Sequence, residues 1–349
     1  MLCHYSQLNY NLSHPIPSVP AEATLNKKMP SLTAFLFKQG LRRTAHPNFA
    51  SSDSFDAAVK ENRATCSHEP PPDVRSSVNI EQAHVGTSIV YTVKPATDNA
   101  APFQMRIMYI HGGAFVFEID ELHWRLIATL CQRLNASITV PIYPLAPEHH
   151  VTDMYGMLEP IYSDMASSYS SFPSSASDSS SPPTPFYVAG DSAGGGLALG
   201  LTQQALLEQR PVAKGMVLIC PSVDTTLANP DVHVKTKTDP YLDMPGLAHA
   251  LNMAMGTMDR RNHLVSPTFG PIFGLPPMLV FIAEEDILGP DDEIFVQKAI
   301  DEGCQVELFR GPGMWHVWVA MPIPEAKPAM DKIVSWLQCN SQVHLTEWK

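Results

Sequence analysis

The sequence lacks paired cysteines of the kind that bind zinc or exchange disulfides. Its six cysteines form no C-x-x-C motif and lie far apart, several of them inside apolar runs. This spacing excludes a zinc ribbon and gives no sign of a disulfide framework. We therefore expect buried free thiols in a reducing compartment. The cysteines are Cys3, Cys66, Cys131, Cys220, Cys304 and Cys339.

Positive charge, targeting signals and metal motifs are also scarce. Lys and Arg number 23 against 35 Asp and Glu, and no basic block stands out, which excludes a nucleic-acid partner. The amino terminus has no secretory signal pattern, and no apolar run is long enough to span a bilayer. The 14 histidines show no HExxH or paired ligand spacing. We expect a cytoplasmic protein with no membrane span, no metal and no cofactor.

What is present is an ordinary globular composition, 44% hydrophobic and 17% charged, in which strands and helices alternate. The strands are mostly short apolar runs of the kind that lie buried in a parallel sheet, with helices on both faces. The predicted strands are 78–85, 88–93, 105–110, 137–143, 186–189, 215–220, 278–283 and 306–309. The predicted helices of this part are 122–134, 193–209 and 324–338.

Three segments fall outside this alternation. Residues 1–30 are polar, contain four prolines and are predicted to be disordered. Residues 163–185 form a predicted Ser/Pro-rich loop, with eleven serines between Ser163 and Ser181. Residues 222–265 lie between two core strands and contain Met-rich, helix-like stretches. Together with 31–72, which contains two predicted helices, they are expected to form a helical cap over the carboxyl ends of the strands. The main unit is thus a single α/β domain over 31–349.

The most specific local pattern is G-x-S-x-G at residues 190–194, between a strand and a helix. A nucleophile on such a sharp turn takes a strained backbone, and small neighbours at Gly190 and Gly194 avoid clashes. The following helix directs its free N–H groups toward the reacting carbonyl. Ser192 is therefore the candidate nucleophile. The alternative is a simple glycine-rich turn.

A second pattern, HGGAF at residues 111–115, directly follows the strand 105–110. Consecutive glycines expose backbone N–H groups, which acyl-transfer enzymes need to stabilise an oxyanion. We assign the N–H groups of Gly112, Gly113 and Ala193 to the oxyanion hole. His111 itself is interpreted as a structural hydrogen-bonding residue.

These motifs resemble the hormone-sensitive-lipase-like branch of the α/β-hydrolases. The matching pieces are HGGAF at 111–115, YPLAPEHH at 143–150, GDSAGGG at 190–196 and Ser266-Pro267, in the family's order over roughly residues 75–340. One departure is Ala114, where many members have a third glycine. The resemblance implies an α/β-hydrolase fold and a serine hydrolase that cleaves carboxylic esters of short to medium acyl chains.

The fold then requires an acid and a histidine after the nucleophile, in that order. His316 follows the last predicted strand in a loop, and it matches the family's histidine. Asp286 follows the strand 278–283, matches the family's acid and precedes His316 by 30 residues. Glu285 and Asp291 are the alternatives, and Asp291 is expected to be a solvated loop residue. The other downstream histidines are His233, His249, His263 and His344.

The substrate side is less specific. Phe115 and Trp315 are candidates for an apolar substrate pocket, whereas Trp318 is interpreted as core. The same triad also serves lactonases, thioesterases and acyl-transfer or condensation enzymes, and these remain alternatives. A catalytically silent ligand-binding member is a further one. The expected partner is a small-molecule ester, and the resemblance leaves a homodimer open.

Overall fold

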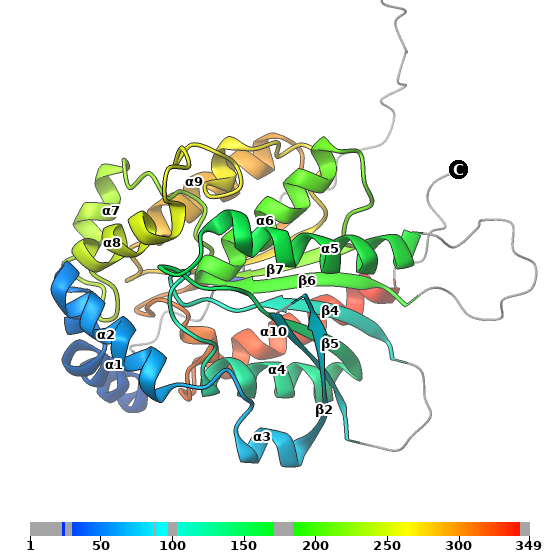
Figure 1. The fold of residues 1–349 in the computed structure, drawn as a ribbon, viewed down its shortest axis with the longest axis horizontal. Helices are drawn as coiled ribbons and strands as arrows, with labels where there is room; N and C mark the ends of the chain where they lie inside the picture. The colour runs from blue at the N-terminus through cyan, green and yellow to red at the C-terminus, as the bar shows by residue number, and fades with distance from the viewer. Residues whose placement is uncertain (1–22, 25–29, 87, 97–102, 171–183, 343–349) are drawn as a thin grey trace, which may run out of the picture.

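A single mainly parallel sheet organises the molecule (Figure 1). The computed structural model describes residues 23–24, 30–86, 88–96, 103–170 and 184–342. Within these residues the sheet has nine strands in the order β1-β9-β8-β7-β6-β4-β5-β3-β2. All neighbours from β1 to β5 in this order are parallel, and β3 and β2 continue the edge antiparallel. The mainly parallel sheet predicted from the sequence is therefore present.

The bounds of the elements agree closely with the predicted ones where a strand or helix was expected. The strands are β1 Ala23–Thr24, β2 Val78–Val85, β3 Ser88–Pro95, β4 Met105–Ile110, β5 Ala136–Ile142, β6 Phe186–Asp191, β7 Gly215–Ile219, β8 Met278–Ala283 and β9 Val306–Gly311. The helices are α1 Leu32–Thr44, α2 Ser52–Thr65, α3 Pro72–Ser77, α4 Glu121–Leu134, α5 Val151–Ser170, α6 Ser192–Leu207, α7 Pro230–Lys235, α8 Met244–Met255, α9 Gly289–Asp301 and α10 Ala326–Gln342.

The strands divide the core into two halves because successive side chains point to opposite faces of the sheet. In β4, Ile107 and Tyr109 join the core beneath α4 and α10, whereas Met108 and Ile110 join the core beneath α5, α6 and α9. Figure 1 shows these two helical layers on opposite faces of the sheet. Burial on both faces explains why these strands read as continuous apolar runs.

One prediction, the Ser/Pro-rich loop at 163–185, is wrong for its first part. Residues 163–170 continue helix α5, while 171–183 lie outside the described residues. Tyr162, Met165 and Ala166 are buried in the core at helical spacing, which outweighs the serine composition. The Ser168 hydroxyl donates to the Asp164 carbonyl one turn earlier, so this serine is accommodated in the helix.

The amino-terminal segment was predicted to be disordered over residues 1–30. Most of it, residues 1–22 and 25–29, lies outside the described residues. Ala23 and Thr24 contradict the prediction, because they pair in parallel with Phe309 and Arg310 of β9. Edge pairing satisfies backbone groups that the open side of β9 exposes, and it needs no apolar side chains.

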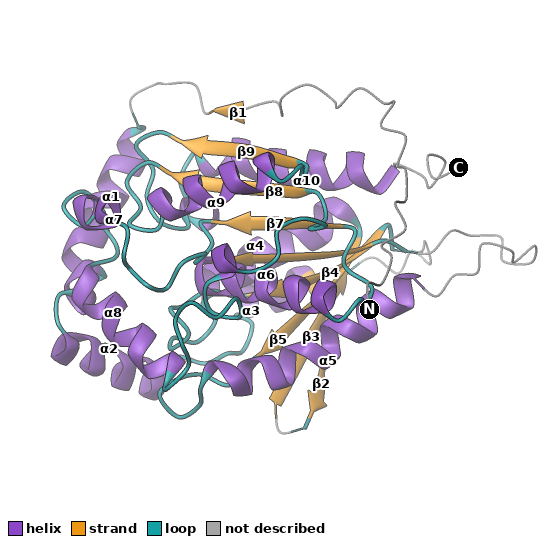
Figure 2. Cartoon of the chain, turned by 90° about the horizontal axis from the view of Figure 1, so that it is seen from above, coloured by secondary structure: helices purple, strands orange, loops and turns teal. Residues whose placement is uncertain are grey.

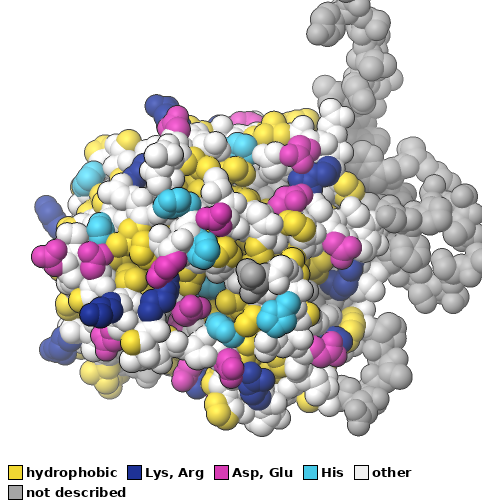
Figure 3. Space-filling model, in the orientation of Figure 1, with side chains coloured by type: hydrophobic (Ala, Val, Ile, Leu, Met, Phe, Trp, Pro, Cys, Tyr) yellow, Lys and Arg dark blue, Asp and Glu magenta, His cyan; other side chains and the backbone are white. Residues whose placement is uncertain are grey.

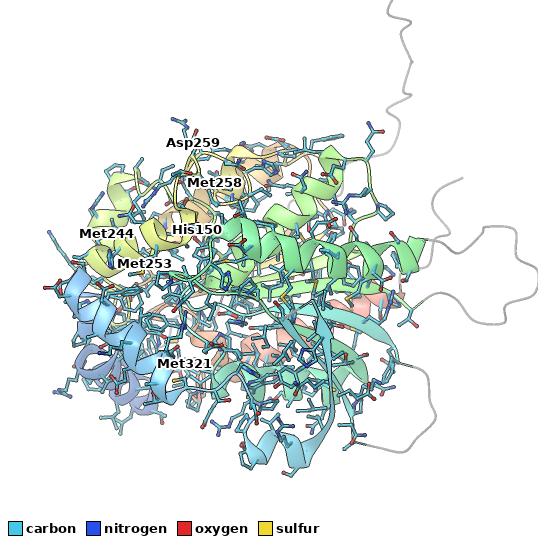
Figure 4. All side chains as sticks on the ribbon, in the orientation of Figure 1. His150, Met244, Met253, Met258, Asp259 and Met321 are labelled. Atoms are coloured by element: carbon cyan, nitrogen blue, oxygen red, sulfur yellow. The ribbon has the colours of Figure 1, made fainter. Side chains whose placement is uncertain are left out.

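Helices from the two predicted cap segments lie together at one end of the sheet. Figure 2 shows α1, α2, α7 and α8 beyond the arrowheads of β7, β8 and β9, which is the carboxyl end of these strands. Arg63 of α2 donates to the carbonyls of Val116 and Ala146 in the loops beneath. His150 bonds to the Met253 carbonyl of α8 (Figure 4). Residues 31–72 and 222–265 are called the cap below.

The surface charges, the helices and the cysteines can be compared with three expectations from the sequence: no nucleic-acid partner, no membrane span and buried free thiols. In Figure 3, acidic and basic side chains are interspersed on the visible face rather than gathered into one basic patch. Among the helices of the described residues, none combines the length and apolar character needed to cross a membrane. The five described cysteines are free, and Cys131 and Cys220 are buried as expected, whereas Cys66 and Cys339 are exposed.

The packing of the two cap segments on each other depends on a close backbone approach at Gly246. A Cβ there would lie 2.5 Å from the Cα of Phe49 and 2.8 Å from its carbonyl oxygen. We predict that Gly246→Ala destabilises the fold by about 1–3 kcal/mol because backbone must move. The control is Gly156→Ala, at an exposed helical position with no atom within 4 Å of the added carbon. It should stabilise by up to about 1 kcal/mol. Thermal melting of both variants tests this, and equal shifts would contradict it.

Candidate active site

The turn from β6 into α6 places Ser192 at the first position of the helix. Ser192 has φ +51°, in the left-handed region that is strained for a side chain. The turn fits only because its neighbours are glycines. A Cβ on Gly194 would clash with the carbonyl oxygens of Ile110 and His111, and one on Gly190 would lie 2.6 Å from the Gly194 oxygen. The predicted strand–turn–helix context is therefore the observed one.

Ser192, His316 and Asp286, which are far apart in sequence, meet at this turn. Ser192 Oγ lies 2.8 Å from His316 Nε2, and His316 Nδ1 lies 2.8 Å from Asp286 Oδ2. The three residues are 8%, 3% and 0% exposed. With Nδ1–H donating to the carboxylate, Nε2 is left to accept the serine hydroxyl proton. The arrangement can transfer a proton from Ser192 to His316.

The imidazole of His316 is tuned by opposing effects. Burial, the largest influence, lowers its pKa, but the charges of Asp286, Asp239 and Asp191 raise it, and the pKa stands above its ordinary value. A base with a raised pKa accepts the serine proton more readily. It also becomes protonated, and unable to act as a base, at a higher pH.

The HGGAF loop lies beside the nucleophile, but not all of its backbone N–H groups are available to a substrate. The N–H of Gly112 donates to Asp191 Oδ1 at 3.1 Å, so the assignment of this group to the oxyanion hole is corrected. Gly113 (φ +109°) sits against the Phe117 carbonyl, where a Cβ would lie 2.6 Å away. Among the described residues, the N–H groups of Gly113 and Ala193 have no acceptor. Ala114 holds φ +54°, a left-handed conformation that glycine adopts more readily than alanine.

A buried charged network behind this loop was not predicted from the sequence. His123 Nε2 lies 3.1 Å from Asp191 Oδ2, and its Nδ1 lies 2.8 Å from Asp120 Oδ1. Burial lowers the pKa of His123, but the charges of Asp191 and Asp120 raise it well above the usual value. The Tyr109 hydroxyl also donates to Asp191. The sequence signal was the capping pattern D-x-x-H at 120–123.

His111 contributes structure, in keeping with its predicted role. Its Nδ1 bonds to the Gly112 carbonyl, and its ring stacks on Tyr143 with centroids 4.4 Å apart. Burial, followed by the nearby charge of His123, lowers the pKa of His111 to about 4. The ring is therefore neutral near pH 7, and it holds the loop without adding a charge.

The rejected candidates for the acid and the base occupy other places. Glu285 pairs with Lys38 of α1. Asp291 is 6% exposed in α9 and accepts from Asn229, so the expectation of a solvated loop residue is wrong. The alternation of strands and helices in the sequence did not predict helix α9, whose buried side includes Asp291 and Asp292. His249 bonds to Asp56 and His263 to Gln204.

A cavity of about 520 Å³ opens onto Ser192 and His316. Phe115 lines it, as predicted, whereas Trp315 does not. Trp315 is fully buried and stacks on Phe37 of α1. It belongs to the half of the core that lies beneath α4 and α10. Trp318 is core, as interpreted. Leucines of the cap and of the start of α9, and polar residues of α2, are among its lining residues. They are Leu242, Leu247, Leu251 and Leu288, and Glu61, Asn62 and Thr65.

Comparison with known proteins places this geometry in a family. A family model described as alpha/beta hydrolase fold matches residues 107–320, more than half of the chain. The chain belongs to the α/β-hydrolase fold family. This match covers the nucleophile turn, the acid, the histidine and the HGGAF loop, and it confirms the predicted fold class.

Individual relatives agree with this membership. An esterase of Acinetobacter venetianus is 29% identical over 236 residues, covering 66% of this chain and 73% of the relative. A carboxylesterase of Mycobacterium tuberculosis is 26% identical over 299 residues, covering 80% and 88%. These relatives support the predicted hormone-sensitive-lipase-like branch and agree with an ester hydrolase.

Solved structures show the same fold at low identity. An esterase/lipase from an uncultured bacterium superposes with a TM-score of 0.73 at 23% identity, covering 89% of this chain and 99% of that one. A thermostable esterase from Pseudomonas putida gives a TM-score of 0.73 at 20% identity, covering 90% and 98%.

The charges around His316 predict how the pH profile responds to a change of the acid. In Asp286→Asn the main interaction that raises the pKa of His316 is lost, so the acid limb of kcat/KM should move to lower pH. Because Asn also favours the wrong tautomer, kcat should fall by on the order of 10,000-fold. Ester hydrolysis measured across the range in which histidine titrates checks both effects. Asp291→Asn is the control, and an equal loss in it would contradict the assignment of Asp286.

Proposed function

We propose that this protein is a serine hydrolase that cleaves carboxylic esters of short to medium acyl chains through an acyl-enzyme. The observation that carries the proposal is the unbroken chain of hydrogen bonds from Ser192 through His316 to Asp286 at the floor of the cavity. Curated relatives that bear the names esterase and carboxylesterase support it.

The reaction follows from the positions of the polar atoms. His316 Nε2 takes the Ser192 hydroxyl proton as Oγ attacks the ester carbonyl, and a tetrahedral oxyanion forms. His316 then gives that proton to the departing alcohol oxygen as the C–O bond breaks. Water, deprotonated by His316, attacks the acyl-enzyme, and the acid leaves as Ser192 regains its proton. Asp286 holds the imidazole in orientation through both halves.

The oxyanion is assigned to the N–H groups of Gly113 and Ala193. Both belong to backbone that is fixed before substrate arrives, one in the HGGAF loop and one at the first turn of α6. A preorganised donor of this kind typically contributes about 3 kcal/mol of transition-state stabilisation. Gly112 acts indirectly, since its N–H fastens the loop to Asp191.

The cavity favours an apolar acyl group of limited length. The leucines from the cap and from the start of α9 offer the acyl chain an apolar wall, and the polar side of α2 is left for the alcohol. A volume of about 520 Å³ lies within the usual range for small-molecule sites. A homodimer and a cytoplasmic location stay predictions from the sequence.

The first test is hydrolysis of p-nitrophenyl esters from acetate to decanoate. Wild type should turn these esters over with a clear optimum of chain length. Ser192→Ala and His316→Ala should each lower kcat by on the order of a million-fold, because nucleophile and base act as one unit. A fluorophosphonate should label wild type but not Ser192→Ala. A folded wild type that neither hydrolyses an ester nor becomes labelled would exclude the proposed activity.

The leucine wall makes a separate prediction about chain length. Leu251 of α8 is buried and lines the cavity, so Leu251→Phe should shorten it and move the optimum toward acetate. The matched control is Met253→Phe on the same helix, at a position that does not line the cavity. Comparing kcat/KM across the ester series measures the shift. An unchanged optimum in Leu251→Phe would place the acyl chain elsewhere.

A further inference from the structure

The cap carries a buried carboxylate that the reaction above does not use. Asp239 lies between α7 and α8 and is 3% exposed. Its Oδ1 accepts the N–H groups of Tyr241 and Leu242, at 2.8 and 3.0 Å, which forms a tight turn within the cap. Three N–H groups in all converge on this side chain, and the third comes from outside the cap.

That third donor belongs to the loop that holds the triad acid. Asp239 Oδ2 accepts the N–H of Ile287 at 2.9 Å, and Ile287 directly follows Asp286. Asp286 in turn accepts the N–H of Leu288 through Oδ1 while its Oδ2 faces His316. The backbone on the carboxyl side of Asp286 is therefore fixed by one bond from its own side chain and one from the cap.

The cap also contacts the two residues before Asp286. Lys235, at the end of α7, donates to the Glu284 carbonyl, and Lys38 of α1 pairs with Glu285. Of the cap residues in these contacts, Asp239 alone reaches the far side of Asp286 and brings a negative charge toward His316. The turn that Asp239 forms also places Tyr241, whose ring centroid lies 6.2 Å from that of His316.

We propose that Asp239 is a positioning residue of the active site, which fastens the cap to the loop that carries Asp286. The inference rests on the proposed ester hydrolysis. Asp239 touches neither the substrate carbonyl nor the nucleophile, and it acts by fixing the acid against His316 and by its charge. It makes the pocket wall at Tyr241 and Leu242 and the acid of the triad parts of one hydrogen-bonded unit.

The electrostatic surroundings support this role. Burial, followed by the charge of Asp286, raises the pKa of Asp239 to about 7, so the carboxylate carries its charge above that pH. In that form Asp239 is among the charges that raise the pKa of His316. The other ionisable groups around this cluster come from several elements. They are Asp292 of α9, Cys220 at the end of β7, Asp191 at the end of β6, and Tyr241, Lys235 and Lys38 of the cap.

The test compares Asp239→Asn with Asp243→Asn in the full-length protein, with p-nitrophenyl butyrate as the substrate. Asn keeps an oxygen for Tyr241 and Leu242, but it loses the charge and turns an N–H toward the Ile287 N–H. We expect kcat to fall by on the order of ten- to a hundredfold with KM little changed. The acid limb of kcat/KM should move to lower pH, because a charge that raises the pKa of His316 is removed. Asp243 caps α8 through Met244 and has no bond to the acid loop in the described contacts, so its variant should match wild type.

The pH limb separates positioning from a merely structural role. If Asp239→Asn lost activity only in proportion to its folded fraction, with the limb unchanged, or behaved as wild type, the proposal would be overturned. Should Asp239→Asn fail to fold, Asp239→Ser can keep the cap turn through its hydroxyl and still lose the charge and the Ile287 contact. The position of the acid limb in the kcat/KM profile of Asp239→Ser then decides the question. Ser192→Ala measured in parallel distinguishes a failure of the proposed hydrolysis, which would appear as equal rates in wild type and Ser192→Ala and would remove the basis for Asp239.

Discussion

The close contact between the β6–α6 turn and the end of β4 is the constraint on which the active site depends. Gly190 and Gly194 let the turn approach the backbone of Ile110 and His111 more tightly than any side chain would allow. This approach puts the strained Ser192 beside the HGGAF loop, and Asp191 then joins the two through the Gly112 N–H. The strain at one residue is held by a contact that involves no side chain at all. Nucleophile and oxyanion donors are consequently parts of one rigid backbone assembly.

Buried charge is the second theme, and it is arranged in pairs. An isolated carboxylate in the interior is costly, whereas a carboxylate that accepts several N–H groups or faces an imidazole is stabilised. Asp191 meets His123, and Asp286 meets His316. Asp292 differs, since burial and neighbouring acids raise its pKa well above the usual value, which favours the neutral form. Many of the buried ionisable groups thus lie around the HGGAF loop and the loop that carries Asp286.

The sequence predicted the parts of this structure that depend on local patterns. The sheet strands follow from apolar runs, and Ser192 and His316 follow from motifs whose strand and loop context could be inferred. Asp239 could not be found in this way, because its importance comes from a contact across 48 residues with Ile287. Gly112 was misassigned because only the three-dimensional structure shows its N–H directed at Asp191. Trp315 was misplaced since its position next to His316 in the chain does not determine the direction of its ring. Residues 163–170 were predicted as a loop from their serine content, but they are helical because Met165 and Ala166 are buried in the core.

The walls of the cavity and its floor come from different parts of the architecture. The floor is made of turns at the ends of sheet strands, where a Cβ added at Gly190 or Gly194 would lie less than 3 Å from backbone oxygens. The walls include helices and loops of the two cap segments, 31–72 and 222–265, which meet the rest of the molecule through individual hydrogen bonds and ion pairs. Substitutions on the leucine side or on the α2 side can therefore accumulate without disturbing the backbone that reacts. Such a division lets a lineage explore new substrates by gradual change while its reaction chemistry stays fixed.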